Sequence, residues 1–170
     1  MKIFIKYLFI WITVVLCQVL ICNNIQLFGY INPYIYIIFI LLLPLKTSKY
    51  LVLLLGFLLG LSIDIFSNTP GIHASATTFM AFLRPYIINI LFNRESIDKK
   101  HLPSISSMGL SWFIKYTVIM VLVHHLFLFY IEAFSFTNFF FTLTRCLSSA
   151  VFSIILLIIS QLLFFKERQK

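Results

Sequence analysis

Residues 51–81 read LVLLLGFLLGLSIDIFSNTPGIHASATTFMA, and this stretch decides how the chain folds. It joins two strongly apolar runs through a short polar turn and carries one acid, Asp64, near the end of the first run. A carboxylate inside a segment meant for hydrocarbon is costly, so we expect it to face protein and not lipid. Gly56, Gly60 and Asp64 recur every four residues. On a helix they share one face, where the two glycines allow a neighbouring helix to approach the acid.

The composition of the chain places it in a bilayer. Of its 170 residues, 61% are hydrophobic and 11% are charged, and the mean hydropathy is +1.03. A soluble domain of this size could not bury so many apolar side chains, because small domains expose a large share of their surface. The net charge of +8 does not indicate nucleic acid, because most basic residues lie in the gaps between apolar runs and not on one solvated face.

Six apolar runs predict an all-α polytopic membrane protein with six transmembrane helices, folded as a single domain over residues 1–170. A helix needs about 20 residues to cross a bilayer. The second run is the least regular, because Pro33 lies near its start and Pro44 near its end. The runs cover about residues 3–21, 28–45, 50–66, 71–92, 110–131 and 139–165.

Gaps that carry lysine or arginine alternate with gaps that carry none. Because positive residues stay on the cytoplasmic side, this alternation supports six crossings with both termini in the cytoplasm. It also supports the second helix, since deleting that helix would place the first two groups of basic residues on opposite sides. The groups are Lys2 and Lys6; Lys46 and Lys49; Arg94, Lys99 and Lys100; and Lys166, Arg168 and Lys170.

The fourth run carries two polar residues that are candidates for function. His73 opens it on the same outer side as Asp64, and Arg84 lies deeper. Pro85 follows Arg84 and removes a backbone donor, so we expect a kink and a freed Ala81 carbonyl. Arg84 is then either a deep functional cation or a structural side chain that reaches the freed carbonyl or a headgroup.

The last two runs contribute further charges at the depth of Asp64. Glu132 ends the fifth run, and Arg145 lies in the outer third of the sixth. Opposite charges at one depth in lipid usually pair. We therefore expect Arg145 to be the partner of Asp64, with His73 as the alternative.

None of the common catalytic patterns is present in the sequence. It has no H-E-x-x-H, no G-x-S-x-G and no Walker A loop. His124 and His125 are adjacent, so their rings point to different faces of a helix and do not converge on one metal ion. His125 instead lies on nearly the same face as Glu132. We expect no enzyme, no cofactor and no metal, whereas a small permease or substrate-binding subunit stays open because intramembrane charges also mark substrate pathways.

Several short motifs resemble one family. Residues 60–66 (GLSIDIF) followed by Pro70, Gly71 and His73 resemble the G-x-x-x-D and G-x-H/A signature of the bacterial rod shape-determining protein MreD family. Residues 82–87 and 130–134 resemble members from the Bacteroidetes lineage. The chain length, the six expected crossings and the brief loops fit as well, so the resemblance covers essentially the whole chain.

The resemblance implies a non-enzymatic, multi-pass protein of the inner membrane that takes part in cell elongation. Its implied partners are an MreC-like periplasmic protein, an MreB-like actin homologue, a RodA-type glycosyltransferase and a penicillin-binding transpeptidase, which together build the lateral peptidoglycan. The family's fold is also similar to the substrate-binding membrane subunit of energy-coupling-factor transporters. That similarity gives the alternative function, a substrate-binding subunit of a transporter.

Overall fold

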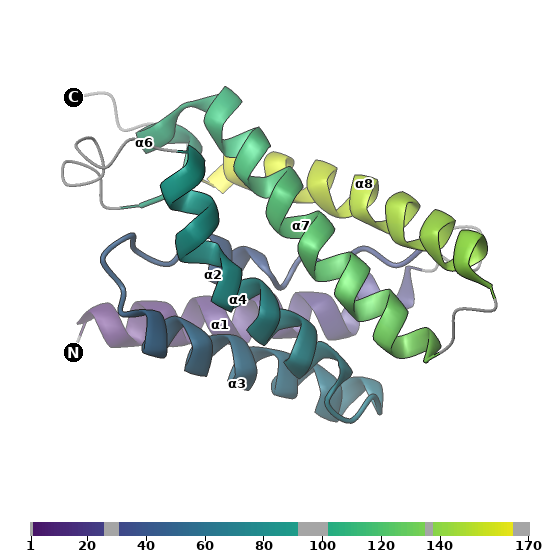
Figure 1. Ribbon diagram of the computed structural model, residues 1–170. Helices are drawn as coiled ribbons and strands as arrows, with labels where there is room; N and C mark the ends of the chain where they lie inside the picture. Colours follow the sequence, from purple (N-terminus) through teal and green to yellow (C-terminus); the bar gives the residue numbers. More distant parts are fainter. Residues whose placement is uncertain (1, 26–30, 92–101, 135–137, 165–170) are drawn as a thin grey trace.

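The structure, a computed structural model, describes residues 2–25, 31–91, 102–134 and 138–164 (Figure 1). Long helices dominate this part of the chain and lie side by side in a bundle. Its helices are α1 (Lys2–Leu20), the 3-10 turn η1 (Cys22–Asn24), α2 (Ile38–Leu41), α3 (Lys49–Ser67), α4 (Ile72–Leu91), α6 (Ile105–Met108), α7 (Leu110–Ala133) and α8 (Phe139–Phe164).

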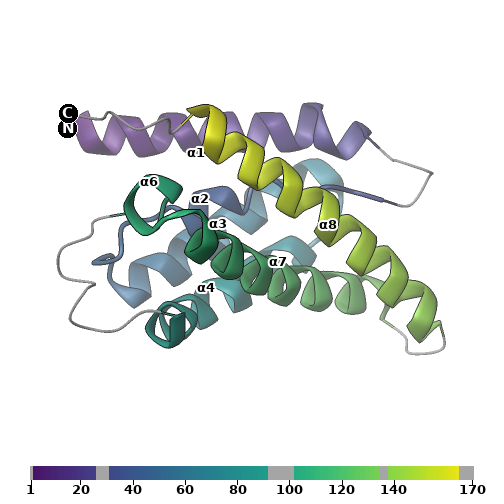
Figure 2. The same ribbon diagram turned by 90° about the horizontal axis from the view of Figure 1, so that it is seen from above.

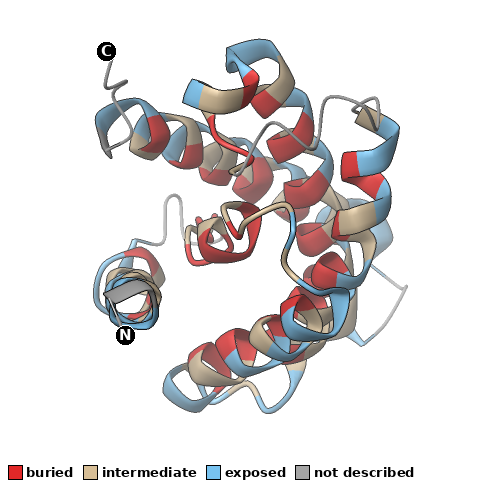
Figure 3. Cartoon of the chain, turned by 90° about the vertical axis from the view of Figure 1, so that its left-hand side faces the viewer, coloured by how far each residue is buried: buried red, intermediate tan, exposed pale blue. Residues whose placement is uncertain are grey.

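Four of these helices, α1, α3, α7 and α8, are long and apolar enough to cross a membrane. Their outer faces expose large apolar side chains such as Phe9, Leu54 and Ile155. Figure 3 shows the buried residues on the faces that turn inward and the exposed ones outside. α4 has comparable length, but it is less apolar on average and is not one of the four. The described part of the chain is therefore all-helical, with four helices that could span a membrane by length and composition.

The predicted second helix is wrong. Of residues 28–45, the first three lie outside the described part, and from Ile31 the chain is irregular apart from the four residues of α2. Pro33 and Pro44 explain this, because a proline inside a helix removes a hydrogen bond and clashes with the preceding turn. Residues 31–45, called here the inner segment, still pass back along the bundle, with α2 between α1 and α7 (Figure 2).

The helices therefore run in alternate directions. One direction is shared by α1, α3 and α7, and the opposite direction by the inner segment, α4 and α8 (Figure 1). α1 begins at the end of the bundle where α8 ends. We call the end where α3 stops and α4 starts the Asp64 end, and the opposite one the Arg84 end. The basic groups at residues 94–100 and 166–170, on which the predicted orientation partly rests, lie outside the described residues.

The inner segment fills the core of the bundle. Tyr36, Ile37, Ile40 and Leu41 are each 0% exposed. Phe39, in the same segment, packs against α1, where the centroid of the Trp11 ring lies 5.1 Å from that of Phe39. An irregular backbone is tolerated at membrane depth only where it is buried in protein or lines a cavity, and this segment is buried in protein.

The closest helix contact joins α3 to α4, and the two expected glycines make it possible. A Cβ added to Gly60 would lie 2.6 Å from the backbone nitrogen of Ala74, and one added to Gly56 would lie 2.8 Å from the Ala81 Cβ. Both glycines are buried. The predicted close approach of a helix on the Asp64 face is thus present, and its partner is α4.

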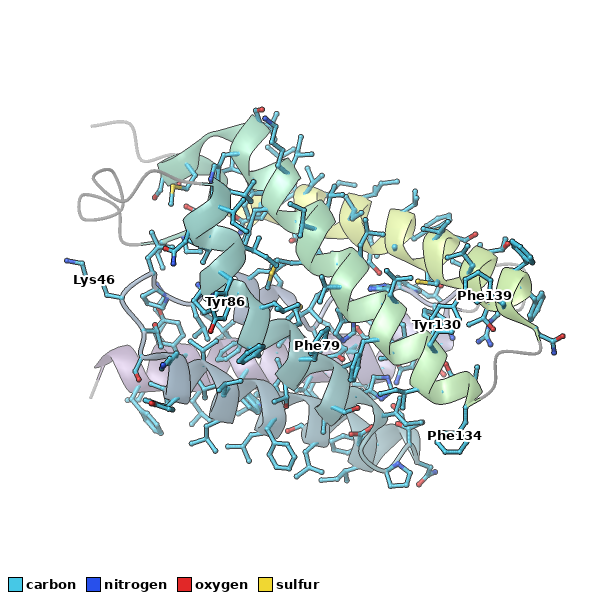
Figure 4. All side chains as sticks on the ribbon, viewed as in Figure 1. Lys46, Phe79, Tyr86, Tyr130, Phe134 and Phe139 are labelled. Atoms are coloured by element: carbon cyan, nitrogen blue, oxygen red, sulfur yellow. The ribbon has the colours of Figure 1, made fainter. Side chains whose placement is uncertain are left out.

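Aromatic pairs hold the remaining helices together. Phe79 of α4 stacks on Phe127 of α7, with ring centroids 4.6 Å apart. Tyr130, near the end of α7, lies 5.3 Å from the ring of Phe139 at the start of α8 and donates a hydrogen bond to its carbonyl. Figure 4 labels Phe79, Tyr130 and Phe139, together with Phe134, which projects from the end of α7 and is 94% exposed.

Candidate functional site

Asp64 is a structural joint between α3 and α4. Its Oδ1 accepts the backbone N–H of His73 at 3.0 Å and its Oδ2 accepts that of Ala74 at 2.9 Å. These two groups belong to the first turn of α4, whose N–H groups have no partner inside the helix. Asp64 is only 3% exposed and thus caps the next helix from within the bundle.

Two side chains complete the set of donors to Asp64. The Nδ1 atom of His73 lies 3.0 Å from Oδ1, and the hydroxyl of Thr69 donates to the same oxygen at 2.9 Å. The turn that brings them there needs a left-handed backbone at Asn68 (φ 53°) and at Gly71 (φ 85°), with the exposed Pro70 between them. Only glycine adopts the second conformation without strain, which explains the short polar turn of the sequence.

The predicted pairing of Asp64 with Arg145 is wrong, and the alternative partner, His73, is the one that the structure places there. Arg145 is half-buried on α8, with its guanidinium carbon 5.3 Å from the centre of the Phe129 ring. Its Nε has no hydrogen-bond partner in the part of the chain that the structure describes. Four donors from the adjoining turn and the start of α4 already surround the Asp64 carboxylate, so it does not need a distant cation. Equal depth in the membrane was not sufficient to pair Asp64 with Arg145.

Polar side chains from the surrounding helices satisfy the backbone of the inner segment. Gln18 of α1 accepts the N–H of Ile35 at 2.8 Å and donates to the carbonyl of Pro33 at 3.0 Å. On the other side, two serines of α8 act as acceptors. The bonds are Asn32 N–H to Ser149 at 3.1 Å and Tyr34 N–H to Ser153 at 2.8 Å. These side chains replace the hydrogen bonds that a helix would have formed internally.

At the Arg84 end, Arg84 and Tyr116 donate hydrogen bonds to the backbone carbonyls of the inner segment. Arg84 is 2% exposed and donates to the carbonyl of Leu43 and, through Nε, to the Tyr116 hydroxyl at 3.1 Å. Tyr116 in turn donates to the carbonyl of Leu41 at 3.2 Å. The structural interpretation of Arg84 is therefore correct, but the carbonyls belong to the inner segment and not to Ala81. α4 continues through Pro85.

A chain of hydrogen bonds crosses the core through the two adjacent histidines. His125 Nδ1 lies 2.9 Å from the Val121 carbonyl, which can only accept, so in a neutral ring this nitrogen carries the hydrogen. Its Nε2 then accepts from Ser153 at 3.0 Å. His124 Nδ1 faces His125 Nδ1 at 3.4 Å and must be an acceptor, so its Nε2 donates to the Tyr36 hydroxyl at 2.7 Å.

Tyr36 extends this chain to α4. Its hydroxyl lies 3.0 Å from that of Thr77, which donates to the His73 carbonyl. The rings of His124 and His125 thus turn to different partners, as their adjacency predicted. Within the described residues no group of three histidine, cysteine or acidic side chains is arranged to hold a metal ion.

A polar cavity of about 360 Å³ opens at the Asp64 end. His73 and Glu132 line it, and Asn32 and Tyr34 of the inner segment form part of its wall. Glu132 is exposed, whereas Tyr34 is 6% exposed. The structure therefore brings three of the predicted candidates, Asp64, His73 and Glu132, to one end of the bundle, while Arg84 lies at the other.

Sequence reasoning missed the residues that make the inner segment possible. Gln18 was available as a signal, because it is the only amide inside the first apolar run. The tyrosines at 34 and 36 alternate with isoleucine, a period of two that is typical of extended chain and not of helix. The chain matches no protein-family model, no curated protein and no solved structure with which it was compared.

Proposed function

We propose that this chain is a non-enzymatic, multi-pass protein of the bacterial inner membrane that acts in cell elongation, as its MreD-like motifs imply. In this role it helps to couple an MreC-like protein and an MreB-like filament to lateral peptidoglycan synthesis. One observation carries the proposal. The residues on which the resemblance rests, Gly60, Asp64, Gly71 and His73, are those that join α3 to α4.

This coincidence supports the proposal because the motif has a definite mechanical task. Gly60 allows the backbones of the two helices to meet, Gly71 makes the turn, and Asp64 with His73 closes it. Any protein built on the same joint needs the same residue types at the same spacing. A short motif with such a task is better support for a shared fold than an apolar run of equal length.

The proposed topology has six passages, of which the second is the inner segment. Its support is the alternate direction of the helices together with the alternation of basic residues in the gaps. Both termini and the Arg84 end then face the cytoplasm, and the Asp64 end faces the periplasm. The apolar side chains exposed along α1 and α8 offer surfaces on which single-span or multi-span partners can pack within the bilayer.

A pull-down from native membranes tests the proposed role. The MreC-like protein and the wall synthases should be recovered together with the tagged chain, and depletion of the chain should turn rod-shaped cells round. Recovery of neither partner, with cells that stay rod-shaped after depletion, would overturn the proposal.

The cavity at the Asp64 end favours a second candidate, a substrate-binding membrane subunit of a transporter. Its volume of about 360 Å³ lies within the range of about 300–1,000 Å³ that is usual for small-molecule sites. An interrupted membrane segment beside the cavity is also typical of transporter binding sites. Recovery of a pair of ATPases in the same pull-down would favour this function over the first.

A further inference from the structure

The polar cavity at the Asp64 end offers several hydrogen-bond acceptors. Asn24 uses both of its amide hydrogens on the carbonyls of Val19 and Leu20, which leaves its oxygen. The Oδ1 atom of Asn32 is buried and has no hydrogen-bond partner among the described residues. A buried carbonyl oxygen without a donor is destabilising, so an occupant that supplies an N–H would relieve this penalty.

His73 and Glu132 extend the same pattern. The Nδ1 atom of the His73 imidazole donates its hydrogen to Asp64. In the neutral ring, Nε2 is therefore free to act as an acceptor. Thr69 adds no free donor to the cavity, because its hydroxyl hydrogen is directed at the same carboxylate. Glu132 adds a carboxylate that has no hydrogen bond or ion pair with the described residues, and it is exposed at the cavity.

The charge of the cavity is negative. Glu132 is the one charged residue of the described chain that lines it, and neither lysine nor arginine does. The nearest basic side chain of α8, Arg145, is directed at the Phe129 ring and is not part of the lining. The remaining wall includes apolar side chains, among them Val19 and Leu128, which suit a short carbon chain.

We propose that this cavity binds a primary ammonium group, held by Glu132, the free oxygen of Asn32 and Nε2 of His73. A primary ammonium carries one positive charge and three N–H donors, which matches one carboxylate and two neutral acceptors. A quaternary ammonium has the charge but no N–H, so it leaves the Asn32 oxygen unsatisfied. The inference goes beyond both proposed functions, because a scaffold or a substrate-binding subunit can hold such a ligand equally well.

Two sources of the ammonium group are compatible with the position of the cavity. It is either a free primary amine or the ethanolamine headgroup of a phospholipid, since the cavity lies at the end of membrane-spanning helices where headgroups gather. Two arms of one experiment separate them. In the first, ethanolamine is titrated calorimetrically into the protein in phosphatidylcholine nanodiscs; in the second, native mass spectrometry measures lipid retained from mixed phosphatidylethanolamine and phosphatidylcholine.

Choline is the matched control for ethanolamine, as phosphatidylcholine is for phosphatidylethanolamine. We expect saturable binding of the primary amine in at least one arm and at least tenfold weaker binding of its quaternary counterpart. Glu132→Gln should weaken amine binding by about tenfold to hundredfold, because the negative charge that attracts the ammonium is lost while a neutral acceptor remains. Lys115→Gln, which removes a charge from the other end of α7, should leave binding unchanged.

The thermal melting curve of each variant shows whether it is folded. Glu132 is exposed, so its substitution should keep the melting temperature of the parent protein. Binding in the lipid arm alone assigns the headgroup, and binding in the soluble arm assigns a free amine. The proposal is overturned if choline binds as well as ethanolamine, if Glu132→Gln binds the amine unchanged, or if the folded parent protein binds neither amine.

Discussion

The Oδ2 atom of Asp64 accepts the backbone N–H of Ala74 at 2.9 Å, so a side chain of α3 caps the first turn of α4. The two residues are ten positions apart and lie on opposite sides of a turn. A buried acid in a membrane helix therefore has a task that involves no ligand. Its negative charge also favours the positive N-terminal end of the α4 dipole, which strengthens the joint.

The first prediction concerns the partner of Asp64. Asp64→Asn should lower the stability of the purified protein by about 1–3 kcal/mol, because an amide cannot accept at both positions. In double-mutant cycles, Asp64→Asn and His73→Phe should show a coupling energy of about 0.5–3 kcal/mol, whereas Asp64→Asn and Arg145→Gln should be additive. Thermal melting in detergent measures both cycles. Stronger coupling to Arg145 than to His73 would contradict the joint described above.

The second prediction separates the two glycines of the α3–α4 contact. Gly60→Ala should be the more harmful change, because its new methyl group would meet the backbone of Ala74, which cannot move aside. Gly56→Ala would meet mainly the Ala81 side chain, so the double variant with Ala81→Gly should regain part of the loss. Overpacking of this kind is destabilising by about 1–3 kcal/mol.

Melting temperature and protein level in membranes are the measurements for these glycine variants. Under the proposed function, Gly60→Leu should also turn rod-shaped cells round, while neutralising Lys99 and Lys100 together should have a mild effect. Rods of normal shape with Gly60→Leu at a normal protein level would count against a role of this joint in cell elongation.

The sequence was sufficient to predict the all-helical class, the bounds of five helices to within two residues, and the close approach of a helix on the Asp64 face. These features depend on local composition and on a four-residue spacing, which are visible in a single chain. The inner segment was not predictable in the same way. Its apolar residues are as suitable for a helix as those of its neighbours, and only Pro33, Pro44 and the Tyr-Ile alternation indicate otherwise.

The candidate site was only partly predictable for a related reason. Depth along a helix follows from sequence position, so the gathering of Asp64, His73 and Glu132 at one end was within reach. The rotation of each helix about its axis depends on packing across the whole bundle. For that reason Arg145 could be assigned the right depth and still face Phe129 instead of the acid.

The third prediction tests whether the inner segment crosses the membrane. Reporter fusions at Lys49 and Lys100 should read cytoplasmic, and fusions at Asn24 and Asn68 should read periplasmic, because the basic gaps stay inside. Asn24 and Lys49 flank the inner segment and decide the question. If both report the same side, the segment enters and leaves by one surface, and the six-passage topology is incorrect.

The last prediction concerns Gln18, which holds the inner segment from the side of α1. Gln18→Leu preserves the apolar character of the helix but strands the Ile35 N–H and the Pro33 carbonyl, which Gln18 contacts at 2.8 and 3.0 Å. Each stranded group should be destabilising by about 1–3 kcal/mol, since no water replaces the amide in the core. Thr13→Val is the control, because Thr13 lies exposed on the same helix and bonds only within it.

Hydrogen exchange distinguishes the local effect of this substitution from general loosening. In Gln18→Leu the amide of Ile35 should exchange faster, while the amides in the middle of α3, which depend on helix-internal bonds, should keep their protection. Thr13→Val should leave both sets unchanged. Equal acceleration in α3 and in the inner segment would mean that Gln18 supports the bundle as a whole, whereas unchanged exchange at Ile35 would mean that its N–H has another acceptor.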